Sequence, residues 1–139
     1  MQDRVHPAAL TGQIKEATTI EVLLRMHRAY KSHLNHIHLS ACWTSLGQLA
    51  KWGWTERRWV QTNAEPMEPL VQHPVRAAQT GEIGARELAN VGYGAACSSM
   101  GKSLGALFAA LARTAQRRVG EFNAQELANT AWAFATADQ

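Results

Sequence analysis

Residues 81–90 read GEIGARELAN and residues 120–129 read GEFNAQELAN, so the two stretches agree at seven of ten positions. They begin 39 residues apart (120 − 81 = 39), and self-similarity at such a period is typical of repeat proteins. Each copy continues with an aromatic residue at the same place, Tyr93 in the first and Trp132 in the second. We therefore expect an all-α fold, a right-handed α-solenoid of paired antiparallel helices with a repeat period of about 39 residues.

The second copy carries the clearer helix signals. Asn123 precedes Glu126 by three residues, the spacing of a capping box, in which the two side chains satisfy free backbone amides at a helix start. A helix is thus expected to begin near Ala124, and the matching helix of the first copy to run over residues 85–98. The apolar stripe expected on the second-copy helix consists of Leu127, Ala131, Phe134 and Ala135.

A further helix is expected between the two copies. Ser103 can cap its start, and Gly120 is placed to end it, as glycine commonly does just past a helix. Its buried stripe is expected to contain Leu104, Leu107, Phe108, Leu111, Ala112 and Ala115. One unit is therefore a pair of helices, which needs neighbouring units to cover its apolar faces.

The sequence divides into four parts. These are an N-terminal tail (1–17), a degenerate helical repeat (18–51), an irregular helical connector containing tryptophans and prolines (52–80), and one full repeat plus the first helix of the next (81–139). Because Pro66, Pro69 and Pro74 interrupt helices, helix is expected in the connector only over residues 55–63 and 70–79.

Composition favours a folded protein that does not cross a membrane. Of its 139 residues 46% are hydrophobic, but no stretch reaches the roughly 20 predominantly apolar residues of a membrane-spanning helix. The net charge of +3 permits contact with a polyanion without requiring it. Cys42 and Cys97 lie in expected helix interiors, where a free cysteine usually serves as a small buried apolar group. A reducing compartment is therefore expected.

Three features together resemble octotricopeptide-repeat proteins: the string LANTAWAFA at 127–135, the period near 39 residues, and the upstream string NHIHLSACW at 35–43. That family belongs with helical-repeat organellar proteins that include relatives of the Fas-activated serine/threonine kinase and often end in a RAP domain. The resemblance covers about residues 18–139 and implies the N-terminal piece of a longer array. It also implies binding of single-stranded RNA in the mitochondrion or chloroplast, in the stability, processing or translation of transcripts.

A helical repeat can read single-stranded RNA when one helix of each unit presents a polar residue at the same position. Asn90 and Asn129 meet that requirement, and Arg86 and Gln125 lie one turn earlier on the same helix face. These four residues are candidate RNA contacts. The alternative is that the asparagines bridge neighbouring helices by hydrogen bonds and meet no ligand.

A basic strip is a second candidate RNA surface. Arg113, Arg117 and Arg118 near a helix end, together with Lys102 and Arg86, could neutralise phosphates. The alternative is that these side chains are solvated and compensate a helix dipole.

A stacking platform is a third candidate. Three tryptophans alternate with cationic residues over positions 51–59, where Lys51, Trp52, Trp54, Arg57, Arg58 and Trp59 lie close together. Aromatic side chains beside cations are typical of surfaces on which bases stack. The alternative is that the tryptophans belong to the core.

The sequence offers no nucleophile with a paired base, no phosphate-binding loop and no pair of carboxylates at a spacing typical of catalysis. Neither enzymatic activity nor a cofactor is therefore expected. His33, His36 and His38 lack the cysteine or acidic partners of a zinc site, and no metal is expected. The expected partners are single-stranded RNA and, through the exposed face of the C-terminal repeat, other proteins. The alternative function is a protein-interaction scaffold, because stacked helices also form concave surfaces for peptides or subunits.

Overall fold

The computed structural model describes residues 7–100 and 104–137 of the chain. Within these residues the protein consists of eight α-helices and short 3-10 turns, and it contains no β-strand. The all-α prediction is therefore confirmed. The solenoid and its period of about 39 residues stay predictions.

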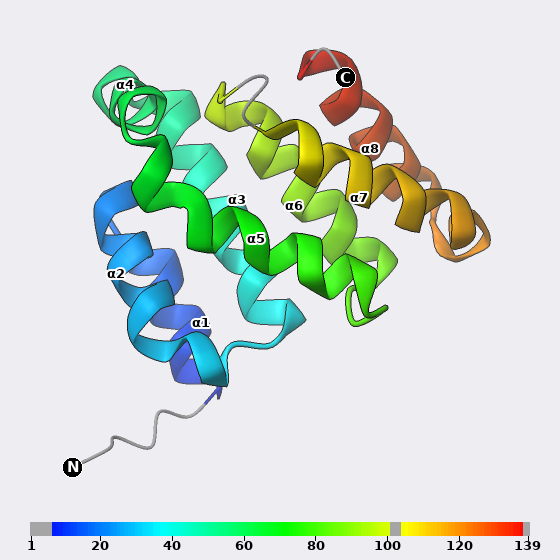
Figure 1. Cartoon of the computed structure of the whole chain (residues 1–139), viewed down its shortest axis with the longest axis horizontal. Coiled ribbons are helices and arrows are strands. Elements are labelled where there is room, and N and C mark those ends of the chain that lie inside the picture. Colours follow the sequence, from blue (N-terminus) through cyan, green and yellow to red (C-terminus); the bar gives the residue numbers. More distant parts are fainter. Residues whose placement is uncertain (1–6, 101–103, 138–139) are drawn as a thin grey trace.

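The long helices form two layers (Figure 1). The first layer contains, in order of contact, α1 (Pro7–Glu16), α3 (His36–Trp52), α6 (Ala85–Ser98) and α8 (Ala124–Thr136). The second layer, which faces the viewer in Figure 1, contains α2 (Ile20–Tyr30), α5 (Ala64–Gln79) and α7 (Gly105–Arg117). The short α4 (Trp54–Thr62) packs against α3 and α5.

Helices that follow one another in the chain run antiparallel between the layers, and neighbours within the first layer therefore run in the same direction (Figure 1). Ser40 of α3 lies beside Asn90 of α6, and further along both helices Gly47 lies beside Gly94. The same holds for α6 and α8, whose first residues, Ala85 and Ala124, are 39 positions apart (124 − 85 = 39).

The backbones of α3 and α6 touch where two glycines meet. A β-carbon on Gly94 would lie 2.0 Å from the carbonyl oxygen of Trp43, and one on Gly47 would lie 2.7 Å from the α-carbon of Gly94. Real β-carbons do not approach other atoms so closely, so any side chain at Gly94 would force the helices apart. The glycines thus set the spacing of the first layer at this point.

The core lies between the two layers. Trp43 and Phe108, at 0% and 1% exposure, are its largest fully buried side chains. Both layers contribute further buried residues, among them Leu23, Leu39, Leu46, Leu70, Leu88, Leu104, Leu107 and Leu111. Full burial of such a side chain is worth roughly 1.5–3 kcal/mol, so interlayer packing is the main stabilising contribution.

Side-chain caps fix where three helices begin. The hydroxyl oxygen of Thr19 accepts a hydrogen bond of 3.1 Å from the amide of Val22 at the start of α2. The capping box predicted at Asn123 and Glu126 is confirmed at the start of α8, with hydrogen bonds of 2.7 and 3.0 Å. A second capping box begins α3, where His38 in place of an acidic residue completes the pair with Asn35. Ser103, the predicted cap of α7, lies outside the described residues.

The tail predicted over residues 1–17 is wrong for its second part, because Pro7–Glu16 forms the helix α1. Leu10 and Ile14 are 2% and 1% exposed, and α1 packs against α3. Two apolar positions four residues apart form too short a stripe to distinguish a helix from a tail in the sequence.

The connector predicted over residues 52–80 is more regular than expected, since α5 spans Ala64–Gln79 without interruption. Pro66 lies in the first turn of α5. Proline is tolerated there because the amides of the first turn of a helix make no hydrogen bond within the helix, so none is lost. Pro69 and Pro74 lie inside α5 and each removes a helical hydrogen bond. Burial of one face of α5 in the core offsets that cost.

One prediction for the C-terminal unit is wrong, and a second is confirmed only in part. α7 ends at Arg117, and Gly120 lies in a 3-10 turn without a positive φ, so glycine does not end this helix. The stripe predicted on α8 faces the core only through Phe134, which packs edge-on against Phe108 of α7, whereas Leu127 is 44% exposed and Ala133 is buried instead. α8 contacts α6 through Ala133 and α7 through Phe134, whereas Leu127 stays open to solvent.

Candidate nucleic-acid interface

Arg86 and Asn90, two of the predicted RNA contacts, line one groove in the first layer. Both belong to α6, and α1 and α3 form the other walls of this groove, whose volume is about 560 Å³. The other polar residues along it include Lys15, Ser40, Thr44, Ser45 and Gln48. The groove therefore combines cationic, amide and hydroxyl groups, the kinds of side chain that bind phosphates and base edges, with one carboxylate, that of Glu87.

Asn90 also joins two helices. Its Nδ2 donates a hydrogen bond of 2.9 Å to the hydroxyl oxygen of Ser40 on α3. This contact is of the bridging kind that the sequence analysis gave as the alternative to RNA binding. Asn90 thus has a structural role even though its side chain borders the groove.

Gln125 and Asn129 lie on α8, the outermost helix of the first layer. Gln125 is exposed and Asn129 is half-buried, but neither borders the groove that contains Arg86 and Asn90. The structure thus places Arg86 and Asn90 on α6, and Gln125 and Asn129 on the neighbouring α8. The two pairs of predicted RNA contacts do not share a pocket.

The predicted basic strip is not a single surface. Arg113 and Arg117 lie on α7 in the second layer, where they border a small hollow of about 160 Å³ together with Gln79 of α5. Arg86 lies on α6 in the first layer, on a different face. Helical spacing places residues on a face of their own helix but does not tell which layer that helix joins. Lys102 lies outside the described residues.

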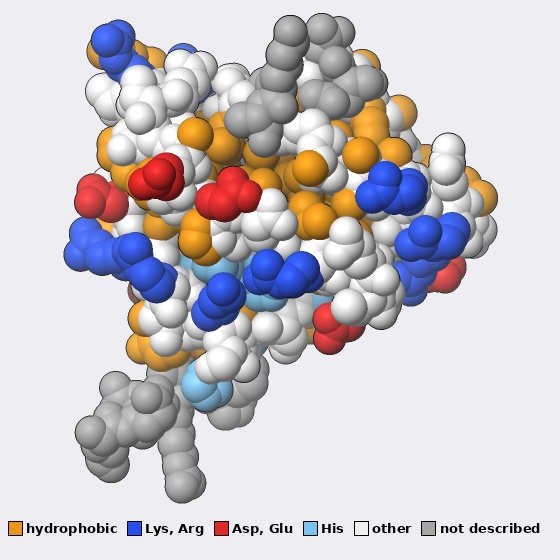
Figure 2. Space-filling view, in the orientation of Figure 1, with side chains coloured by type: hydrophobic (Ala, Val, Ile, Leu, Met, Phe, Trp, Pro, Cys, Tyr) orange, Lys and Arg blue, Asp and Glu red, His pale blue; other side chains and the backbone are white. Residues whose placement is uncertain are grey.

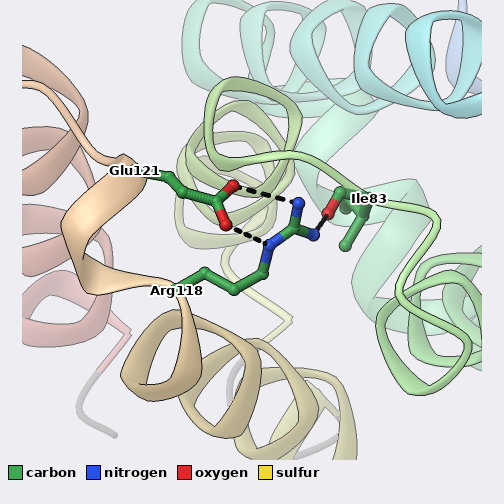
Figure 3. A network of polar contacts seen from close by, with 3 residues as sticks. All are labelled: Ile83, Arg118 and Glu121. Atoms are coloured by element: carbon green, nitrogen blue, oxygen red, sulfur yellow. Dashed lines mark hydrogen bonds and ion pairs between the residues drawn. The ribbon is translucent and has the colours of Figure 1, made fainter.

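Arg118 is engaged in structural contacts (Figure 3). Its Nη1 donates a hydrogen bond to the carbonyl oxygen of Ile83, just before α6. Its Nε and Nη2 lie 3.1 and 3.0 Å from the carboxylate oxygens of Glu121, which is the one ion pair within residues 7–100 and 104–137. Because the guanidinium holds the end of α7 against the start of α6, it is not free for a phosphate.

The predicted tryptophan platform is divided. Trp59 packs partly buried against the core, whereas Trp52 and Trp54 are 80% and 62% exposed. Arg57 donates a hydrogen bond of 2.8 Å to the carbonyl oxygen of Ala50 and is therefore tied to the end of α3. Only part of the segment presents aromatic surface to solvent.

A set of side chains across three helices, here called the aromatic ladder, consists of Trp52, Lys51, Tyr93 and Trp132. The rings of Tyr93 and Trp132 are stacked, with centroids 5.1 Å apart and planes inclined by 27°. Lys51 Nζ lies 3.4 Å from the Tyr93 hydroxyl and 5.2 Å from the Trp52 ring centroid. The ladder runs over α3, α6 and α8. Its signals in the sequence were the matched positions of Tyr93 and Trp132 and the place of Lys51 and Trp52 in the predicted stacking platform.

The cysteines do not suggest reactive thiols. Burial raises the pKa of the Cys42 thiol to about 12. Burial also raises the pKa of Cys97, although a hydrogen bond with Tyr93 and the charge of Lys51 act in the opposite direction. A thiol with a raised pKa is a poor nucleophile and a poor metal ligand at neutral pH.

Neither a metal centre nor a membrane span is found in the part of the chain that the structure describes. No three histidine, cysteine, aspartate or glutamate side chains are grouped there as a metal ion would require. None of the described helices combines the length and the apolar character needed to cross a bilayer.

Comparison with known proteins gives no family. The chain matches no family model, no curated protein and no solved structure. Any function must therefore be argued from the geometry of the chain itself.

Proposed function

We propose that the protein binds single-stranded RNA on the first layer of helices, and the aromatic ladder is the observation that carries this proposal. Exposed aromatic rings from consecutive helices offer surfaces on which successive bases can stack. Trp52 is 80% exposed and Trp132 is 43% exposed, although burial of such rings would stabilise the protein. Lys51 lies among the rings and supplies a positive charge for the phosphates that connect the bases.

The groove beside the ladder supports the same proposal. Lys15, Ser45 and Gln48 border both the groove that contains Arg86 and a second hollow that reaches Trp52. Polar groups therefore extend from the ladder towards the predicted RNA contacts on α6. Base edges would meet the amide and hydroxyl groups while Arg86 and Lys15 meet phosphates, which is the usual division of contacts at nucleic-acid interfaces.

This proposal includes the role that the resemblance to octotricopeptide-repeat proteins implies, namely the stability, processing or translation of organellar transcripts. It is supported by the 39-residue offset between the starts of α6 and α8 and by the two layers of alternating helices. If one helix of each repeat unit contacts one base, then α3, α6 and α8 would contact successive bases of the RNA.

The experiment measures the affinity of the whole chain for fluorescent single-stranded oligonucleotides at low salt. Trp52→Ala and Trp132→Ala are each expected to weaken binding about tenfold, because stacking on an aromatic ring is worth roughly 1–3 kcal/mol per base. Trp54→Ala is the matched control, since Trp54 is 62% exposed but lies outside the ladder.

Two results would contradict the proposal. One is the absence of RNA binding at low salt, where phosphate contacts are strongest. The other is an equal loss of affinity in the Trp54→Ala variant, because binding would then depend on exposed tryptophan in general and not on the ladder.

The alternative function, a protein-interaction scaffold, is favoured by the outer face of α8. Leu127 is 44% exposed, whereas Leu88, at the matching position of α6, is 1% exposed. An apolar side chain left open at the end of a layer suits contact with another protein surface. A protein that fails to bind RNA under the conditions above would support this alternative.

A further inference from the structure

The outer face of the second layer carries a band of lysine and arginine side chains that crosses α2, α5 and α7 (Figure 2). Within it, the ends of α2 and α5 enclose a shallow groove of about 590 Å³. Its charged residues are Arg28, Lys31, Arg76 and Glu82. We propose that this groove binds a phosphate monoester group, as a site independent of RNA binding on the first layer.

The charge of the groove suits a dianion. Three cations and one carboxylate line it, which gives a formal charge of +2 (3 − 1). Within the described residues, Arg118 and Glu121 form the one ion pair, so none of the three cations is neutralised by a neighbouring carboxylate. The carboxylate of Glu82 instead accepts a hydrogen bond of 2.7 Å from the Thr80 hydroxyl.

The positive charges converge on a pair of histidines at the base of this region. Nε2 of His27 and Nδ1 of His73 lie 2.9 Å apart, and His73 borders the groove. Burial is the largest cause of the lowered pKa of both histidines, and the charges of Lys31 and Arg76 lower both further, while the carboxylate of Glu82 acts in the opposite direction on His73. Two cations that act on the same two rings from α5 and from the turn after α2 create a site of positive potential.

A phosphate monoester suits this site better than a backbone phosphodiester. A monoester carries a charge between about −1.5 and −2 near neutral pH and three acceptor oxygens. Arginine side chains bind such oxygens in a bidentate manner, and two arginines and one lysine border this groove. The hydroxyl group of Ser32 also borders the groove and can donate to a remaining oxygen, whereas the Thr80 hydroxyl already donates to Glu82.

The histidine pair provides the readout. An anion between Lys31 and Arg76 would offset the positive charge beside both rings, so the imidazole resonances of His27 and His73 should move as the site fills. The experiment titrates the whole ¹⁵N-labelled protein with inorganic phosphate at pH 7.5 and follows both rings by nuclear magnetic resonance. A parallel titration uses sodium chloride at matched ionic strength.

A saturable shift with phosphate and none with chloride is the expected result. Arg76→Gln and Lys31→Gln should each weaken phosphate binding about tenfold, as loss of a charge-assisted hydrogen bond does. Arg58→Gln, a change at an exposed position on α4, should leave phosphate binding unchanged. The proposal is overturned if phosphate and chloride act alike, if no saturable shift occurs, or if Arg76→Gln binds phosphate as the parent protein does.

Oligonucleotides with and without a 5′-phosphate separate two sources of the monoester. Binding that is about tenfold tighter with the 5′-phosphate, and that loses this advantage in Arg76→Gln, would identify the end of a strand as the ligand. Equal binding of the two oligonucleotides, together with the phosphate-specific shift, would identify a small phosphorylated molecule. Variants of the aromatic ladder should leave the phosphate shift intact, which keeps this test separate from that of RNA binding.

Discussion

At the scale of the residue, Arg118 shows how a predicted ligand contact can be a structural one. The sequence places it next to Arg117 in one basic cluster, yet the two side chains differ in surroundings. Arg117 is exposed, whereas Arg118 donates to the carbonyl oxygen of Ile83 and pairs with Glu121 (Figure 3). An arginine that satisfies a backbone carbonyl cannot be replaced without leaving that acceptor unpaired.

We therefore predict different costs for two neighbouring substitutions. Arg118→Ala should lower the free energy of unfolding by about 1–2 kcal/mol, which is below the roughly 1.5–3 kcal/mol of hydrogen bonds to charged groups because the Arg118 side chain is partly exposed. Arg117→Ala should change it by less than about 0.5 kcal/mol, as surface substitutions usually do. Urea unfolding followed by circular dichroism measures both. Equal values for the two variants would show that the Ile83 contact adds nothing to stability.

His27 is the second residue whose surroundings determine its chemistry. It is 1% exposed, and burial lowers its pKa from 6.5 to about 4, with further lowering by the charges of His73, Lys31 and Arg76. The folded protein thus keeps His27 neutral where the unfolded chain would bind a proton. Unfolding takes up a proton between these two pKa values, so stability must rise with pH across that window.

The predicted result is a loss of stability as the pH falls from about 6.5 to about 4, of up to about 3 kcal/mol from this residue. A double variant, His27→Leu with His73→Leu, should show a smaller loss over the same window, because both ring partners are removed together. Urea unfolding at a series of pH values gives the comparison. The attribution to the histidine pair fails if both proteins lose stability equally between pH 6.5 and 4.

At the scale of the element, the contact between α3 and α6 depends on the absence of side chains. Gly94 lies in a Gly-Tyr-Gly sequence, which in isolation suits a turn, yet all three residues are helical. Glycine costs a helix roughly 0.5–1 kcal/mol relative to alanine. The direct backbone contact with Trp43 provides the reason for glycine at this position.

Gly94→Ala should therefore lower the free energy of unfolding by at least about 2 kcal/mol, since the added methyl group cannot be accommodated without moving α6. Gly12→Ala is the matched control, because Gly12 also lies in a helix but has no atom within 4 Å of an added β-carbon. That control should raise the free energy of unfolding by about 0.5–1 kcal/mol. Thermal and urea unfolding would test the pair, and opposite signs for the two variants are the expected outcome.

At the scale of the whole molecule, the first layer ends with an open apolar face on α8. Leu127 and Trp132 remain 44% and 43% exposed, although Trp132 also stacks on Tyr93 of α6. Repeat arrays normally place a polar surface on their terminal unit, because an open apolar face promotes association. The chain by itself is therefore expected to associate with a second copy through this face.

Sedimentation velocity over a range of protein concentrations tests this expectation. The parent protein should show a concentration-dependent increase in sedimentation coefficient, and Leu127→Glu should abolish it by placing a charge on the apolar face. Ala106→Glu adds the same charge to an exposed position of α7 and should leave the association unchanged. A parent protein that stays monomeric at high concentration would contradict the prediction.

Some features of this protein follow from its sequence alone because they depend on neighbours within a few residues. The capping box at Asn123 and Glu126 fixes the start of α8, and the stripe from Leu104 to Leu111 is buried on α7. Helix periodicity and caps act over one or two turns, so they can be recognised without knowing the fold. The all-α class follows from them.

The tertiary structure alone decided which surfaces the side chains share. Arg86 and Arg113 looked like members of one strip, but their helices belong to different layers. From the sequence, Lys51 belonged to the tryptophan platform and Tyr93 and Trp132 to the two repeat copies, yet three helices of one layer bring these side chains together. The physical reason is that spacing along a helix specifies the face on which a residue lies. Which other helix that face contacts is decided by helix packing, and helix packing depends on contacts between residues far apart in the chain.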